Sequence, residues 1–296
     1  MTGLAARLSR RGALGLLAAT AGGRVTLAAP KPRFEDMPKT LWVWRDRVLS
    51  DDGLAEFAGR HGFTTLFVYV SPTAADALLR GDQHAVSTLQ RLRSGSIRVF
   101  ATAGEPDWSL EPLALPLHVD LLLRLRAAGL IDGIHVDVEP HSLPQWRDGT
   151  ERLRLIEGTI KFYETVRRSA GSTVIDAAVN PIFATIQAGE GTFLSRIVTQ
   201  LDSISIMAYR RPPARAVAWA EPSIRTAEQA RRSWRFGVLV DDEPQEPGID
   251  WSRVPAPTFA GTMVDLDQNL SARFSSGHYA GLAFHAFDGL RSLLGH

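Results

Sequence analysis

Short apolar stretches alternate with longer amphipathic ones along most of the chain. Eight stretches rich in Val, Ile, Leu and aromatic residues have the length of buried β-strands: 40–44, 64–70, 97–103, 133–139, 173–180, 203–209, 236–240 and 279–287. The intervening segments, such as 51–62, 117–129 and 152–171, carry acidic residues early and end on glycine, as helices prefer. Eight strands that alternate with helices predict a single (β/α)8 barrel.

A doubly wound parallel sheet is the alternative arrangement of the same elements. No glycine-rich phosphate loop follows the first predicted strand, although such a loop is typical of doubly wound nucleotide-binding proteins. No linker, low-complexity tract or block of charge interrupts the alternation. We therefore expect one barrel domain over residues 30–296.

The first 29 residues are expected to lie outside the barrel. Ser9, Arg10 and Arg11 precede an apolar segment over residues 12–23, and small residues follow up to Ala29. This arrangement resembles a twin-arginine export signal, and its apolar segment is shorter than the roughly 20 residues of a transmembrane helix. A frayed N-terminal helix is the alternative. We expect residues 1–29 to be a cleaved signal peptide, and the mature protein to be periplasmic or secreted without stable membrane association.

The composition is that of an ordinary soluble globular protein. Of the 296 residues, 45% are hydrophobic and 22% are charged, with a formal net charge of +1 and no cysteine, so thiol chemistry and disulfides are excluded. The basic residues are nearly all arginines scattered among acidic residues, which argues against a nucleic acid partner. We expect a monomer.

The predicted strand over 133–139 carries polar side chains at alternate positions. His135, Asp137 and Glu139 share one face, because successive side chains of a strand point to opposite faces. Two adjacent carboxyl groups in a core are costly unless they are hydrogen-bonded, protonated or functional. Their repulsion raises the pKa of one member, which can then donate a proton near neutral pH. We expect Glu139, nearer the carboxyl end of the strand, to be a general acid, with Asp137 as its partner.

Aromatic and polar residues also fall at the carboxyl ends of the predicted strands, where the active sites of (β/α)8 barrels lie. The candidates for substrate binding are Trp44, Tyr69, Glu105, Trp108, Trp146, Asn180, Met207, Arg210, Asp241 and His285. Aromatic rings stack on the apolar faces of sugars, while acids and amides bind the hydroxyl groups. This pattern predicts a polysaccharide or oligosaccharide substrate.

Four segments resemble motifs of the family 18 glycoside hydrolases, the chitinases and their relatives. DGIHVDVE at 132–139 resembles the fourth-strand signature DGxDxDxE, and SISIMAYR at 203–210 resembles the sixth-strand motif MxYD. YAGLAFHAFD at 279–288 aligns with GGxMFWSxD, and VFATAGE at 99–105 is a looser version of SxGG. The resemblance implies a glycosidase in which Glu139 protonates the glycosidic oxygen, Asp137 assists it and Tyr209 holds the reacting substituent of the sugar.

Three positions depart from the family pattern. His135 replaces an Asp, Arg210 replaces the Asp after the Tyr, and His285 replaces the Trp that forms the floor of the sugar site. In the family, the acetamido oxygen of the substrate is the attacking group, so these departures imply a relative that acts on another polymer than chitin. His135 is the deepest of the polar residues on its strand, and we expect it to hydrogen-bond within the barrel interior.

Three other interpretations remain open. Glu243, after the seventh predicted strand, is a candidate nucleophile for a retaining hydrolase of another clan. The candidate ligands for a hydrolytic metal ion are His135, Asp137, Glu139, His141 and His285, although no HExxH motif occurs. A barrel that binds glycans without cleaving them is the non-enzymatic alternative. The favoured interpretation, a glycosidase, requires neither an organic cofactor nor a metal.

Overall fold

The computed structural model describes residues 32–46, 50, 53–241 and 248–295 of the chain. The predicted export signal lies outside the described residues, as do Asp242 and the candidate nucleophile Glu243. No helix in the described ranges is long and apolar enough to cross a membrane.

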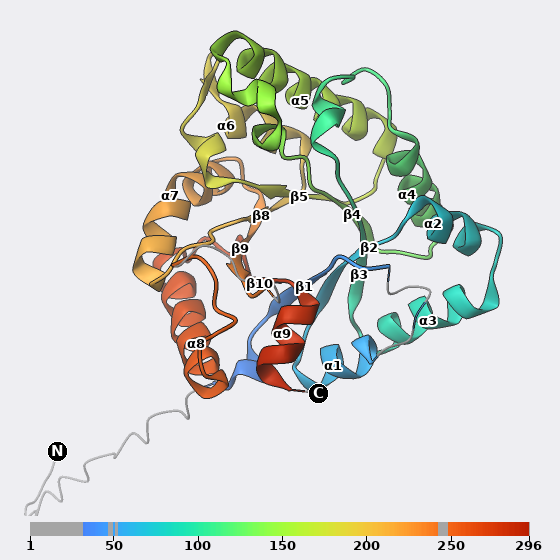
Figure 1. Cartoon of the computed structure of the whole chain (residues 1–296), viewed down its shortest axis with the longest axis vertical. Coiled ribbons are helices and arrows are strands. Elements are labelled where there is room, and N and C mark those ends of the chain that lie inside the picture. The colour runs from blue at the N-terminus through green and yellow to red at the C-terminus, as the bar shows by residue number, and fades with distance from the viewer. Residues whose placement is uncertain (1–31, 47–49, 51–52, 242–247, 296) are drawn as a thin grey trace, which may run out of the picture. The chain divides into compact units, whose positions relative to one another are not determined.

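Within the described residues, the eight predicted strands are all present and form a closed barrel of parallel strands (Figure 1). The order around the barrel follows the order in the chain, and the last strand pairs with the first. The (β/α)8 prediction is confirmed and the doubly wound alternative is excluded. The barrel strands are β1 (Lys39–Val43), β2 (Thr65–Tyr69), β3 (Arg98–Ala103), β4 (Gly133–Val136), β5 (Ile175–Val179), β8 (Ser203–Ile206), β9 (Ser233–Leu239) and β10 (Tyr279–His285).

Helices surround the barrel and cover the outer faces of its strands (Figure 1). The α-helices are α1 (Leu54–Arg60), α2 (Pro72–Leu79), α3 (Gln83–Ser94), α4 (Leu117–Ala127), α5 (Gly149–Ala170), α6 (Phe193–Ile197), α7 (Pro213–Gln229), α8 (Ala256–Arg273) and α9 (Phe287–Leu294). Short 3-10 helices are η1 (Phe34–Asp36), η3 (Pro106–Ser109), η4 (Pro140–Ser142), η5 (Pro144–Arg147), η6 (Pro181–Ala184) and η7 (Val198–Gln200). A two-stranded antiparallel sheet, β6 (Gln187–Ala188) with β7 (Gly191–Thr192), was not predicted.

The helix predicted over 152–171 is α5, and it begins earlier, at Gly149. Asp148 caps it, because its carboxylate accepts hydrogen bonds from the backbone amides of Thr150 and Glu151, both at 2.9 Å. These amides have no partner within the helix, so a cap fixes its first turn. The cap precedes the apolar pattern from which the helix was predicted, which explains the earlier start.

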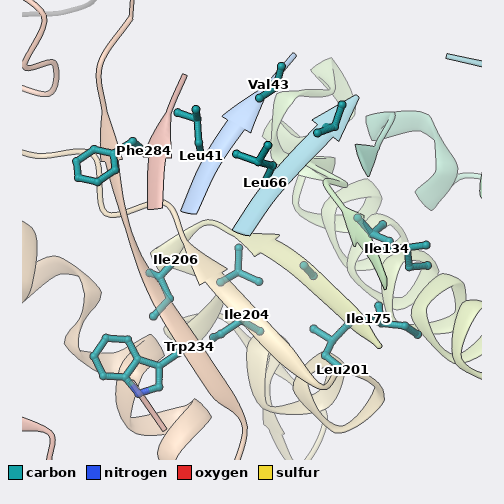
Figure 2. Packing of buried hydrophobic residues seen from close by; sticks show 14 of the residues in the cluster. Leu41, Val43, Leu66, Ile134, Ile175, Leu201, Ile204, Ile206, Trp234 and Phe284 are labelled. Atoms are coloured by element: carbon teal, nitrogen blue, oxygen red, sulfur yellow. The ribbon is translucent and has the colours of Figure 1, made fainter. Parts of the chain in front are cut away.

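Alternate side chains of each strand divide the core into two parts. The outward-facing residues are apolar and pack against the helices, as Leu41, Leu66, Ile134, Ile175 and Ile204 do in Figure 2; all five are fully buried. The inward-facing aromatic residues form a separate cluster with Ala283, made up of Trp42, Phe67 and Phe100. The strands are therefore buried on both faces, as parallel barrels require.

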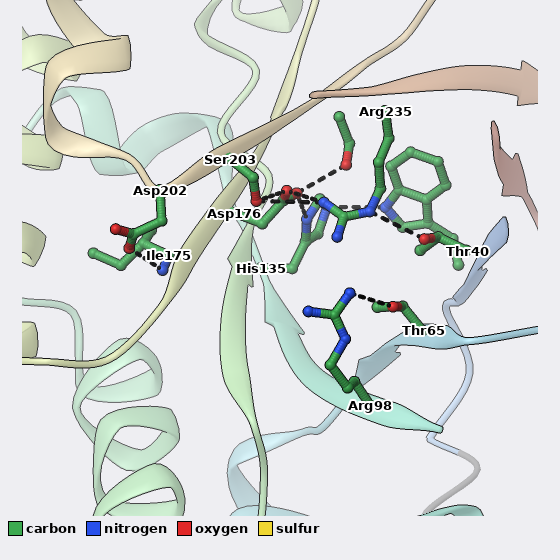
Figure 3. A network of polar contacts seen from close by, with 11 residues as sticks. Thr40, Thr65, Arg98, His135, Ile175, Asp176, Asp202, Ser203 and Arg235 are labelled. Carbon is green, nitrogen blue, oxygen red and sulfur yellow. Dashed lines mark hydrogen bonds and ion pairs between the residues drawn. The ribbon is translucent and has the colours of Figure 1, made fainter. Parts of the chain in front are cut away.

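A polar network fills the barrel interior between β4, β5, β8 and β9 (Figure 3). The carboxylate of Asp176 accepts hydrogen bonds from Ser205 (2.8 Å) and Ser203, and it forms an ion pair with Arg235 at 2.7 Å. His135 contacts the same carboxylate at 2.7 Å, and Asp176 and His135 have no exposed surface. Burial acts to raise the pKa of Asp176, but the charge of Arg235 and these hydrogen bonds outweigh it and lower the pKa, so Asp176 is ionised.

The proton on His135 can be placed from its two partners. The indole N–H of Trp42 can only donate, and it donates to Nε2 of His135 at 2.9 Å. The proton of the neutral ring is therefore on Nδ1, which donates to Asp176. Burial lowers the pKa of His135 and keeps the ring neutral, although Asp176 acts in the opposite direction. The prediction that His135 hydrogen-bonds within the barrel interior is confirmed.

We predict that Asp176→Asn lowers the free energy of unfolding by about 3–5 kcal/mol, because it leaves the buried Arg235 charge without its counter-charge. Urea unfolding at pH 7 measures the effect. The control is Asp76→Asn, which removes the exposed pair with Arg80 on α2 and should cost less than about 1 kcal/mol. Equal losses in the two variants would contradict a stabilising role for the network.

Candidate active site

The two candidate catalytic carboxyl groups lie just beyond the last ladder residue of β4, at the carboxyl end of the barrel. The backbone amide of Asp137 donates to the carbonyl oxygen of Ala103 at 3.1 Å, so Asp137 is still tied to β3. Two residues later, the carbonyl of Glu139 accepts hydrogen bonds from the backbone amide and hydroxyl of Ser142, at 3.0 and 2.8 Å. These contacts anchor the backbone of both acids, one on the barrel and one on η4.

A glycine at the end of β3 allows the close approach of the segment that holds Asp137. A Cβ atom added to Gly104 would lie 1.8 Å from the carbonyl oxygen of Asp137, which is closer than any real contact. On the other side of the segment, Tyr163 of α5 is buried, and its hydroxyl is hydrogen-bonded to the backbone of Val138. The acid segment is thus held between β3 and α5 by backbone contacts.

Asp137 is protonated near neutral pH. Burial is the largest cause that raises its pKa, the negative charge of Glu139 adds to it, and the pKa reaches about 8. Its Oδ1 atom is buried and has no hydrogen-bond partner among the described residues. The side chain of Glu139, by contrast, is 36% exposed. The pair therefore combines a half-buried carboxylic acid, whose Oδ1 atom is enclosed, with a more exposed carboxyl group that a ligand can reach.

Tyr209 follows β8 and lies close enough to both acids to be affected by their charges. Its hydroxyl oxygen is buried and has no hydrogen-bond partner in the described part of the chain. Burial raises its pKa well above the ordinary value, and the negative charges of Asp137, Glu139 and Asp241 raise it further. The phenol therefore stays neutral and can donate a hydrogen bond to a ligand beside the acid pair.

His285, at the end of β10, lies beside Tyr209 and is held by β1. Its ring is 5.7 Å from the ring of Tyr209, between centroids, and the indole N–H of Trp44 donates to its Nε2 atom at 2.5 Å. Burial lowers the pKa of His285 to about 4, although Asp241 acts to raise it, so the ring is neutral. Its Nδ1 atom is buried and without a hydrogen-bond partner among the described residues.

His141 is a residue of the site that the motifs did not identify. Its Nε2 atom lies 3.9 Å from Oε1 of Glu139 and 3.1 Å from Nδ2 of Asn180. The Asn180 amide is oriented because its oxygen accepts from the backbone amide of Ile182, so its nitrogen faces the histidine. Burial lowers the pKa of His141, although Glu139 acts to raise it. Trp146 lies beside this ring, with centroids 6.2 Å apart.

Tyr69 and its acidic neighbours form a separate group at the ends of β2 and β3. Burial raises the pKa of Tyr69, and the charges of Glu105 and Asp46 raise it further, which places these side chains near one another. Trp108 packs on Phe162 of α5, with ring centroids 5.6 Å apart, so part of its surface serves the core. The roles of Tyr69, Glu105 and Trp108 in substrate binding stay predictions.

The remaining candidates differ in their surroundings. Met207 is half-buried at the end of β8, and the backbone amide of Asp241 is held by Asp250 at 3.1 Å. Arg210 turns toward α7, where its guanidinium lies 5.1 Å from the ring centre of Trp219 and Nη1 donates to the Tyr209 carbonyl at 2.7 Å. The side chain that replaces the Asp of the motif is therefore engaged by α7 and by the backbone.

The structure does not support the metal alternative. Both nitrogens of His135 are engaged, by Trp42 and Asp176, so neither has a lone pair available for a metal ion. Across the described ranges, no group of three or more His, Asp or Glu side chains is placed to hold a metal ion. The candidate ligands His135, Asp137 and His285 therefore do not form the predicted site.

Comparison with known proteins shows a similarity of fold. No protein-family model and no curated protein sequence matches the chain. A family 18 chitinase from Pseudoalteromonas aurantia aligns with a TM-score of 0.56 at 12% identity, over 87% of this chain and 100% of that one. An endo-β-N-acetylglucosaminidase from Cordyceps militaris gives 0.52 at 14% identity, over 88% and 83%. A chitinase from Bacteroides thetaiotaomicron gives 0.52 at 13% identity, over 86% and 93%.

The barrel has the fold of the family 18 chitinases. At sequence identities of 12–14%, the similarity shows the fold alone. Any role for an individual residue must therefore be argued from the geometry of the site. That geometry brings Asp137, Glu139, Tyr209 and His285 to one end of the barrel.

The raised pKa of Asp137 predicts a pH-dependent stability. The unfolded chain releases this proton near pH 4 and the folded protein near pH 8, so the free energy of unfolding falls as the pH rises between these values. The side chain of Asp137→Asn does not titrate. The free energy of unfolding of this variant minus that of wild type should therefore increase by at least about 1 kcal/mol from pH 4.5 to pH 8.

Urea unfolding of both proteins at several pH values measures this difference. A difference between Asp137→Asn and wild type that stays constant over this range would contradict a protonated Asp137.

Proposed function

We propose that the protein is a glycoside hydrolase that cleaves an extracellular or cell-envelope polysaccharide, with Glu139 as the general acid and base. One observation carries the proposal: a half-buried acid, Asp137, whose raised pKa keeps its proton near neutral pH, stands two residues before a more exposed carboxyl group that a ligand can reach. Pairs of carboxyl groups in different environments are the usual catalysts of glycosidic bond cleavage.

Glu139 is assigned the role of proton donor because it is the accessible member of the pair. The two groups share one proton near neutral pH, and in the free protein burial keeps this proton on Asp137. A sugar chain that covers Glu139 removes its carboxylate from water, which disfavours the charged form and favours transfer of the proton from Asp137 to Glu139. Glu139 then protonates the glycosidic oxygen, and the ionised Asp137 stabilises the positive charge that develops on the sugar.

Tyr209 is assigned the role of holding the sugar against the acid pair. Its buried hydroxyl has no partner among the described residues, and its pKa keeps it neutral, so it can donate to an oxygen of the substrate. Water finally supplies the hydroxyl group that bonds to the anomeric carbon, and Glu139 recovers its proton. The net reaction is hydrolysis of one glycosidic bond.

The comparisons support a saccharide as the class of substrate. Beyond the two chitinases and the endo-β-N-acetylglucosaminidase, a family 18 chitinase from Cycas revoluta in complex with (GlcNAc)3 aligns with a TM-score of 0.50 at 13% identity, over 86% of this chain and 97% of that one. The substitutions at His135, Arg210 and His285 favour a polymer other than chitin. We propose that the protein acts as a monomer, without nucleic acid or stable membrane association.

We predict that Glu139→Gln abolishes the release of reducing ends, at least about 100-fold below wild type, because it removes the transferable proton and keeps the shape of the side chain. The measurement uses residues 30–296 and a panel of polysaccharides. Glu111→Gln, which changes an exposed carboxyl group between η3 and α4 that is not among the candidate site residues, is the control and should keep its activity within about threefold.

Each outcome of this assay decides between the candidate functions. Release by wild type but not by Glu139→Gln supports the hydrolase and identifies its polymer. Equal release by both proteins would contradict the role of Glu139. Binding of a polysaccharide without release by wild type would identify the barrel as a glycan-binding protein.

We also propose that residues 1–29 direct export by the twin-arginine pathway. The proposal depends on Arg10 and Arg11 before an apolar segment that is too short to span a membrane. We predict that replacing both arginines by lysine keeps a C-terminally tagged chain in the cytoplasm of a bacterium that has this pathway. Cell fractionation measures its location, and export of the variant at the wild-type level would contradict the proposal.

A further inference from the structure

We propose that His285 donates a hydrogen bond from Nδ1 to an axial hydroxyl group of the bound sugar, so that the protein acts on polymers of manno- or galacto-configured sugars. The inference rests on the proposed glycosidase function and names the substrate class of the same site. It follows from the proton position on His285, from the burial of its Nδ1 atom and from the geometry of sugar rings.

The proton of His285 can be placed without reference to a substrate. The indole N–H of Trp44 has no acceptor capacity, so the Nε2 atom that receives it must carry a lone pair. The ring is neutral near pH 7, and a neutral imidazole has one N–H group. That group is therefore on Nδ1, and Trp44 fixes both the orientation of the ring and its tautomer.

The Nδ1–H group lacks an acceptor in the described part of the protein. The Nδ1 atom is buried, and no hydrogen bond to it is found there. A buried donor without a partner is costly, so native proteins keep such groups mainly where a ligand or water completes the bond. Tyr209, 5.7 Å away between ring centroids, has a buried hydroxyl without a partner on the same side of the barrel mouth.

These two donors lie beside the acid pair. The pKa of Tyr209 responds to the charges of Asp137 and Glu139, which places the phenol next to the acids, and the His285 ring packs on the phenol. A sugar whose glycosidic oxygen reaches Glu139 is therefore next to His285 as well. Trp42 and Trp44 surround the other edges of the imidazole, with centroids 5.8 and 5.7 Å away.

The face of the sugar ring decides which substrates can use this donor. A pyranose whose ring substituents are all equatorial presents only C–H groups on its faces, which suits a flat aromatic surface. An axial hydroxyl group projects from the face and offers an oxygen acceptor. The axial hydroxyl at C2 of mannose and that at C4 of galactose project from the same face, so one donor can serve either configuration. A buried donor discriminates against the sugar that leaves it unpaired.

The first experiment tests the tautomer in the free protein. Nitrogen-15 NMR of residues 30–296 at pH 7, with the His285 signals assigned by comparison with His285→Phe, should show a protonated Nδ1 and an unprotonated Nε2. Trp44→Phe removes the donor to Nε2 and should allow both tautomers to be populated. A proton on Nε2 in wild type would overturn the proposal, whatever the protein hydrolyses.

The second experiment tests the choice of sugar with matched oligosaccharides. We expect Glu139→Gln, which keeps the ligand intact, to bind β-1,4-mannohexaose about 10-fold more tightly than cellohexaose, or β-1,6-galactohexaose about 10-fold more tightly than its glucose counterpart. Each pair differs only in the hydroxyl group that is axial. Adding His285→Phe should reduce the preference to within about twofold, whereas adding His84→Phe, the same substitution at an exposed histidine of α3, should leave it unchanged.

The outcomes separate this inference from the proposed function. Hydrolysis of the glucose oligomers at least as efficiently as of their epimers would overturn the inference and leave the glycosidase assignment in place. A preference for the epimers that survives His285→Phe would overturn the role of His285. If wild type neither binds nor hydrolyses any member of the panel of polysaccharides and oligosaccharides, both the proposed function and this inference fail.

Discussion

The carboxylate of Asp176 is the interaction on which the interior of the barrel depends. It accepts hydrogen bonds from β4 and β8 and forms an ion pair with Arg235 of β9, while Arg235 reaches Thr40 of β1 at 3.1 Å. The buried ion pair thus joins β5 to β1, which lies on the opposite side of the barrel. A buried ion pair of this kind is favourable only when its geometry is complete, because removing one member leaves a charge without compensation.

The candidate active site lies directly above this network and differs from it electrostatically. Below, Asp176 is ionised because Arg235 and several donors surround it; above, Asp137 is protonated because desolvation and the charge of Glu139 both raise its pKa. His135, two residues before Asp137 on β4, hydrogen-bonds Asp176 of the neighbouring strand β5. Asp176 is therefore a structural anion and Asp137 a protonated carboxylic acid, and the difference arises from their neighbours.

The eight strands could be predicted because an apolar run bounded by turn residues has few other stable arrangements in a chain of this length. The acid pair could be predicted because period-two spacing places Asp137 and Glu139 on one face. Asp176 was not recognised, although it interrupts an apolar strand as His135 does. Its partner Arg235 is 59 residues away, and only the closed barrel brings the two charges together.

Other parts of the site depend on contacts that a sequence does not encode locally. The position of the proton on His285 depends on Trp44, which is 241 residues away in the chain. The Arg210 side chain points toward α7 because its guanidinium packs on the ring of Trp219. His141 lacks a place in any motif, and its position beside Glu139 follows from the turn into η4. Glu243 is outside the described residues, so the alternative nucleophile stays a hypothesis.

The contact between Gly104 and the carbonyl of Asp137 has a consequence for how the site can change. Because the two backbones touch, the loop that follows β3 and carries Glu105 and Trp108 cannot move independently of the acid segment. A displacement of this loop is transmitted to Asp137 as a movement of its main chain. The positions of the β3 loop and of the acid pair are therefore coupled at this point, so a sequence change that moves the loop also shifts the two carboxyl groups.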